Sequence, residues 1–255
     1  MLRSILVIAL APMALGCGPD LGPSERTSAA RYALVRPGIA VTIVGETYQN
    51  GQLTARSTSR TVVKSAIEFE GRNVHPYEMT AEFRTADGKI LDSAMTMYQY
   101  VDNNISCTVA LVYPGGKTIR LDCEDIDLKT PIAAGTSWTY STRRYPYGGT
   151  VQQLLEFEFV STIDTVGISR VISEQSFTDC ARITTRGLAE PGDTLNCPDG
   201  DSKVSRIESA STRVVCPGVG DVHSVKIERY YASGDGNAVC HEQRAEYETR
   251  ELTAQ

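Results

Sequence analysis

Three histidines and seven cysteines are the residues of this 255-residue chain best suited to catalysis or metal binding. A zinc-protease site would need the pattern H-E-x-x-H, in which two histidines lie one helical turn apart. The segment HEQRA (His241–Ala245) comes closest, but Ala245 stands where the second histidine is needed. The segment also alternates like a strand, in which such positions lie about 13 Å apart. It therefore predicts no zinc site.

Other short motifs also fall short of a reactive site. GISRV (Gly167–Val171) lacks the closing glycine of a nucleophile elbow, and GVGDVH (Gly218–His223) has histidine where a dinucleotide-binding loop needs glycine. The acidic segments 122–127 and 197–202 contain oxygen ligands suited to calcium, but neither has the EF-hand spacing, so we interpret both as solvated turns. We expect no catalytic residue, no metal, no cofactor and no enzyme activity; a hydrolase with an unrecognised site is an alternative.

The histidines and the single tryptophan have plainer interpretations. We expect His75, His223 and His241 to be ordinary strand residues, because each lies in a stretch without a matching catalytic partner. Trp138 is expected in the hydrophobic core, with a place in the wall of a ligand pocket as the alternative.

Cys17 calls for a different chemistry, because it follows an export signal. Arg3 precedes an apolar run, Ile5–Leu15, which is shorter than the roughly 20 residues of a membrane-spanning helix. Ala14–Cys17 (ALGC) resembles the lipobox of bacterial lipoproteins. The resemblance implies that residues 1–16 are a signal peptide, that Cys17 carries acyl chains, and that a membrane is a partner through this lipid. An ordinary secretory signal is the alternative.

The residues after Cys17 fit an anchored domain. Residues 17–30 are polar and contain Gly, Pro and Ser, which predicts a flexible tether. Two or more acyl chains, at about 0.8 kcal/mol per buried methylene, hold a protein stably on a membrane. We therefore expect the protein in the cell envelope. Gly18 replaces the aspartate associated with inner-membrane retention, which favours the outer membrane in a Gram-negative host.

The other six cysteines are expected to form disulfides, because none has the C-x-x-C spacing of a zinc site. A three-residue turn at Pro114–Gly116 sets Cys107 opposite Cys123 on one face of a hairpin. The remaining four allow three pairings, and a meander over residues 177–250 selects among them by strand length. It favours one set, which pairs Cys180 with Cys216 and Cys197 with Cys240.

Period-two alternation predicts a mainly β domain over residues 31–255, without a helix beyond the signal. Residues 154–160 (LLEFEFV) show it best, and turn signals such as Asn50-Gly51 and Asp87-Gly88 separate the strands. The expected fold is an antiparallel meander curled into a barrel, half-barrel or sandwich and held by disulfides. A break near residues 129–138 leaves open a duplication into halves 31–130 and 131–255.

Part of the second half resembles a group of uncharacterised β-rich bacterial lipoprotein domains. The shared motifs are GTSWTY (Gly135–Tyr140), SFTDCARI (Ser176–Ile183), PGVGDVHSV (Pro217–Val225) and the final REL (Arg250–Leu252). The resemblance implies a fold and carries no activity.

The net charge of the chain limits the classes of partner that it can bind. The chain has 25 basic and 31 acidic residues, a formal net charge of −6, and no basic run, so we expect no nucleic-acid partner. The expected function is a non-enzymatic envelope lipoprotein whose β domain binds an envelope protein or has a structural role. The alternative is a carrier or sensor of an apolar ligand such as a lipid. A packed interior favours the first, and a cavity on the order of several hundred Å³ favours the second.

Overall fold

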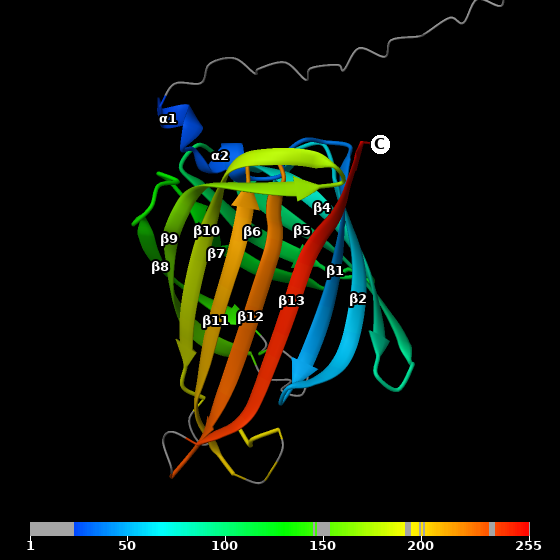
Figure 1. The fold of residues 1–255 in the computed structure, drawn as a ribbon, viewed down its shortest axis with the longest axis vertical. Coiled ribbons are helices and arrows are strands. Elements are labelled where there is room, and N and C mark those ends of the chain that lie inside the picture. Colours follow the sequence, from blue (N-terminus) through cyan, green and yellow to red (C-terminus); the bar gives the residue numbers. More distant parts are fainter. Residues whose placement is uncertain are drawn as a thin grey trace, which may run out of the picture.

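Long antiparallel strands that curl into a nearly closed barrel dominate the structure (Figure 1). The computed structural model describes residues 23–144, 146, 154–191, 195–198, 200, 202–234 and 238–254. The expected signal peptide and Cys17, the expected site of lipidation, lie outside these residues. The mainly β, antiparallel, disulfide-bonded fold expected from the sequence is confirmed, and among the three proposed shapes it is the barrel.

The strands follow the alternating segments of the sequence. They are β1 (Ile39–Gln49), β2 (Gln52–Val63), β3 (Ile67–Phe69), β4 (Arg72–Thr85), β5 (Ile90–Val101), β6 (Ile105–Val112), β7 (Thr118–Lys129), β8 (Ser137–Arg144), β9 (Leu155–Ile172), β10 (Gln175–Ala189), β11 (Val204–Cys216), β12 (Gly220–Ala232) and β13 (Val239–Ala254).

All of these strands belong to one sheet, with the order β7-β6-β5-β4-β2-β1-β13-β12-β11-β10-β9-β8 and with the short β3 beside β4. The sheet therefore consists of two meanders, β1–β7 and β8–β13. They are joined where β1 pairs antiparallel with β13. The connection between β7 and β8 covers residues 130–136, the position of the break seen in the sequence.

Strand β9 shows how the alternation of apolar and polar residues in the sequence corresponds to burial in the barrel. Leu155, Phe157 and Phe159 are buried, whereas the intervening Glu156 and Glu158 are exposed. The ring of Phe159 lies over Gly187 of β10, where an added Cβ would come within 2.2 Å of the ring. A glycine in the strand thus leaves room for an aromatic side chain from its neighbour.

The hairpin of β6 and β7 departs from its expected register. Ile119 lies opposite Leu111, as the three-residue turn predicts, but a shift between Thr108 and Ala110 then sets Cys107 opposite Ile126. The prediction that the two cysteines face each other directly is therefore wrong. Cys123 instead lies in an irregular segment with a φ of 64°, and its Cα is 5.0 Å from that of Cys107, close enough for a disulfide.

Three disulfides connect the six barrel cysteines in the pairs that the sequence favours. Besides Cys107–Cys123, they are Cys180–Cys216 and Cys197–Cys240, with Cα–Cα distances of 4.1 and 6.2 Å. Cys180 lies near the start of β10 and Cys216 ends β11, so both are at one end of the sheet. The disulfides are therefore the pairs that strand length predicts.

The expectation that no helix follows the signal is wrong for residues 23–32, which come directly before the barrel; residues 17–22 of the expected tether lie outside the described residues. Residues 23–32 contain two short helices, α1 (Pro23–Arg26) and α2 (Ala29–Tyr32), and α2 lies across one end of the barrel (Figure 1). Ser28 caps α2 by accepting a hydrogen bond from the backbone N–H of Arg31. Ala29 and Tyr32 are buried, so packing against the barrel holds this segment.

Neither of these helices has the length and apolar character needed to cross a membrane, and the described residues contain no other helix.

Candidate ligand chamber inside the barrel

The barrel is not packed along its full length. A cavity of about 220 Å³ lies inside it, next to the end covered by α2. We call this cavity the chamber. Its apolar wall includes Val41, Ile43, Met79, Met97, Leu128 and Val215. These side chains come from strands on opposite sides of the barrel, and the two methionines give the wall adaptable, polarisable surface.

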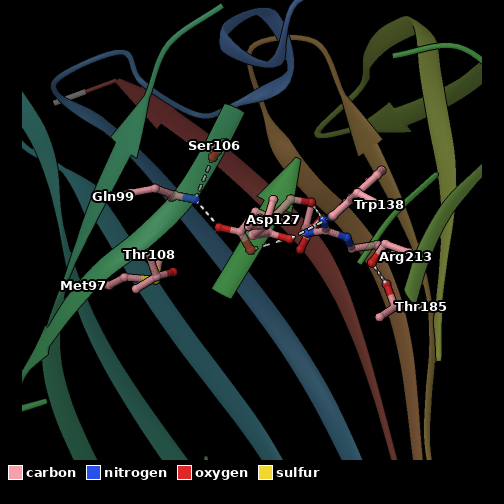
Figure 2. Close-up of polar contacts among 11 residues, drawn as sticks. Met97, Gln99, Ser106, Thr108, Asp127, Trp138, Thr185 and Arg213 are labelled. Atoms are coloured by element: carbon pink, nitrogen blue, oxygen red, sulfur yellow. Dashed lines mark hydrogen bonds and ion pairs between the residues drawn. The ribbon is translucent and has the colours of Figure 1, made fainter. Parts of the chain in front are cut away.

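Polar side chains converge at one end of the chamber (Figure 2). The Gln99 side-chain amide donates hydrogen bonds to the Asp127 carboxylate and to Ser106 Oγ, the latter at 3.0 Å. The Arg213 guanidinium donates to the backbone carbonyl of Asp127. These residues come from β5, β6, β7 and β11, so only the closed barrel brings them together.

Arg213 divides its charge between two carboxylates. Its Nη1 lies 3.8 Å from Asp127 Oδ1 and 3.5 Å from Asp221 Oδ1. The Arg213 side chain is only 15% exposed and Asp127 is 29% exposed, whereas Asp221 is about half exposed. Asp127 is therefore the carboxylate that depends most on this shared cation within the chamber.

Burial changes the titration of this carboxylate. Burial and the neighbouring carboxylate of Asp125 together raise the pKa of Asp127 to about 7, although Arg213 opposes the rise. Burial also raises the pKa of Asp125, whose charge Lys226 and Arg213 partly offset. Near neutral pH the polar end of the chamber thus exchanges a proton readily.

A second, polar cavity of about 160 Å³ continues the interior beyond Asp127 and Arg213, which line both spaces. Its wall includes Asp125, Lys226 and Arg144. Arg144 forms an ion pair of 2.5 Å with Glu228, whose side chain is fully buried. The interior therefore changes from apolar near α2 to charged deeper in the barrel.

The N-terminal segment forms part of the chamber wall. Tyr32, Ala33 and Leu34 line the cavity, and the Tyr77 hydroxyl donates a hydrogen bond to the Leu34 carbonyl. On the other side, the Tyr32 hydroxyl donates to the Asp179 carbonyl at 2.7 Å. The residues that follow the expected lipid anchor are thus fixed directly over the chamber.

The structure places the histidines and the tryptophan as strand residues. His75, His223 and His241 lie in β4, β12 and β13, as expected. Trp138 is buried in β8, and its Nε1 donates to the Ile126 carbonyl of β7 at 3.3 Å. Trp138 belongs to the core, since it does not line the chamber.

The expectation of a solvated turn at residues 122–127 is wrong. These residues belong to β7, and Asp125 and Asp127 face the interior of the barrel. The second acidic segment, 197–202, lies partly outside the described residues. Within the described part of the chain, no group of three or more His, Cys, Asp or Glu side chains is arranged to hold a metal ion.

Sequence reasoning missed Gln99, Asp127 and Arg213 as a group. One signal was available for the aspartates: the spacing of Asp125 and Asp127 puts both on the same face of any strand. Two carboxylates on the inner face of a barrel strand would have been a reason to search the interior for a polar site.

Comparison with known proteins gives little further guidance. No family model and no curated protein matches the chain. Two solved structures are similar: a "putative exported protein with YmcC-like fold" from Bacteroides fragilis and a "putative lipoprotein" from Parabacteroides distasonis. Each has a TM-score of 0.39 and 12% identity, over 88% of this chain and 99% of the other. Similarity at this level carries no argument about function.

Proposed function

We propose that this protein is a non-enzymatic binding protein of the cell envelope, anchored through lipid on Cys17, and that its barrel binds a small amphipathic ligand in the chamber. The observation that carries the ligand is the cavity of about 220 Å³ with an apolar wall and a polar end. An apolar pocket with a few convergent polar groups, one of which has a shifted pKa, is typical of a binding site.

The size of the chamber limits the ligand. Pockets for drug-sized molecules usually measure roughly 300–1,000 Å³, so the chamber suits a smaller molecule with a short apolar tail. The binding of a partner protein on the outer surface, the function first expected from the sequence, stays as the second candidate.

Anchoring is tested by replacing Cys17 with serine. Acylation requires the cysteine thiol, so Cys17→Ser is expected to move the protein from the membrane fraction to the soluble envelope fraction. The measurement is immunoblotting of both fractions after a carbonate wash. Cys107→Ser serves as the control, because it removes a disulfide cysteine and should leave a correctly anchored chain on the membrane. Retention of Cys17→Ser on the membrane would contradict a lipid anchor.

Ligand binding is tested on the soluble Cys17→Ser protein by native mass spectrometry after gentle purification from the envelope. We expect a bound small molecule that is lost when Ile43→Trp fills the chamber. Val44→Trp is the matched control, because neighbouring strand residues point to opposite faces and Val44 does not line the chamber.

The milder variant Ile43→Phe guards against misfolding, and circular dichroism should show native β structure in every variant compared. A ligand-free mass for the unsubstituted barrel would count against the chamber and favour the outer surface. A ligand that persists in folded Ile43→Trp protein would place binding elsewhere.

A further inference from the structure

We infer that the ligand of the chamber is a short-chain amphiphile with a protonated amine head, whose ammonium group lies against the carboxylate of Asp127. This inference rests on the proposed ligand-binding function and adds the charge of the head group. It follows from the charges, the hydrogen bonds and the shape of the chamber.

The charged lining of the chamber has an excess of negative charge. Among the described residues, the charged side chains that line it are Asp127, Asp221 and Arg213, two carboxylates and one guanidinium. Arg213 is already committed, since it binds the Asp127 backbone carbonyl and lies within 3.8 Å of both carboxylates. An anionic head would enter a space where Arg213, the one cation that lines the chamber among the described residues, is engaged, whereas a cationic head would supply the missing charge.

The hydrogen-bonding groups that line the chamber also favour a ligand that donates hydrogen bonds. An ammonium group has three N–H donors and no acceptor. The Asp127 carboxylate, the Thr61 hydroxyl and the Asp221 carboxylate all line the chamber and can accept such bonds. Gln99 already donates to Asp127 from one side and so holds the carboxylate in position.

The apolar part of the chamber wall suits the alkyl tail of such a ligand. Val41, Ile43 and Val215 are aliphatic, and Met79 and Met97 can adjust to a flexible chain. The deeper cavity is lined by Asp125, Lys226 and Arg144, so an alkyl chain is favoured only on the α2 side of Asp127. The head therefore points into the barrel and the tail toward the N-terminal segment.

Titration supports this assignment. Burial destabilises the charged form of a carboxylate and so raises its pKa. A cationic group bound beside the carboxylate stabilises this charged form. The titratable groups around Asp127 are Asp125 on β7, Arg213 on β11, Asp221 and Lys226 on β12, and the hydroxyls of Tyr77 on β4 and Tyr140 on β8. As the pH falls, Asp127 takes up a proton while the amine stays protonated, so binding of the amine should weaken.

The test compares octylamine, 1-octanol and octanoate, which share a tail and differ in head charge. Binding to the soluble Cys17→Ser protein is measured by isothermal titration calorimetry at about pH 8 and about pH 5. We expect octylamine to bind roughly tenfold or more tighter than either other probe at the higher pH. Lowering the pH should weaken octylamine roughly tenfold and leave 1-octanol unchanged.

Asp127→Asn should remove the preference for octylamine while 1-octanol still binds within about threefold. Asp87→Asn, at an exposed turn, is the matched control and should behave like the parent protein. Tighter binding of octanoate, equal binding of all three probes, or a preference that survives in Asp127→Asn would overturn the amine head and leave ligand binding intact. Failure of all three probes to bind would overturn the proposed binding function as well.

Discussion

Replacing Arg144 by methionine is expected to lower the free energy of unfolding by about 3–5 kcal/mol, because it removes the cation that forms an ion pair with the buried Glu228 carboxylate. The Glu228 side chain is 0% exposed, and its Oε1 lies 2.5 Å from Arg144 Nη2. Arg144 also donates to Ser209 Oγ at 3.1 Å and stacks 4.2 Å from the centre of the Phe157 ring. Urea unfolding followed by circular dichroism measures the loss.

The matched control is Arg186→Met, at an exposed position of β10, which should change the stability by less than about 0.5 kcal/mol. A second control is the double variant Arg144→Met/Glu228→Gln. It removes the buried charge as well, so part of the lost stability should return. A loss below about 1 kcal/mol for Arg144→Met alone would show that Glu228 does not need this arginine.

Reduction of the three disulfides is expected to cost about 2–4 kcal/mol for each bridge, or about 6–12 kcal/mol together. A domain of this kind has a total stability of roughly 5–15 kcal/mol, so the fully reduced barrel should be at or beyond the limit of folding. The two longer loops, with sequence separations of 36 and 43, should contribute more than Cys107–Cys123, with a separation of 16.

Thermal unfolding of the Cys17→Ser protein with and without a phosphine reductant measures this effect, and alkylation with mass detection shows that all six thiols are free. The double variant Cys107→Ala/Cys123→Ala should melt higher than Cys197→Ala/Cys240→Ala. An unchanged melting temperature after complete reduction would mean that the barrel does not rely on its disulfides.

The disulfide pairs and the strand faces could be predicted because they depend on local rules. The alternation of apolar and polar residues predicts which residues of β9 are buried, and strand length predicts the disulfide partners of Cys180 and Cys197. The irregular segment at Cys123 could not be predicted, because three extra residues of β7 shift the register there without any change in the alternation nearby.

The helical segment and the chamber depend on contacts between distant parts of the chain. Residues 23–32 look like a polar linker, and α2 is held by the burial of Ala29 and Tyr32 against strands far along the sequence. In the same way, Gln99, Asp127 and Arg213 meet only after the sheet closes. A short-range pattern contains no information about which strands face each other across a barrel.

The two edge strands of the sheet affect how the protein can associate with other copies of itself. β7 and β8 end the sheet, and within the described residues they share no strand pairing, although the Trp138 indole on β8 binds the Ile126 carbonyl on β7. An open sheet would present these two edges as templates for a strand from another molecule. Here β7 and β8 are in contact with each other, so each edge leaves less room for a strand from another molecule.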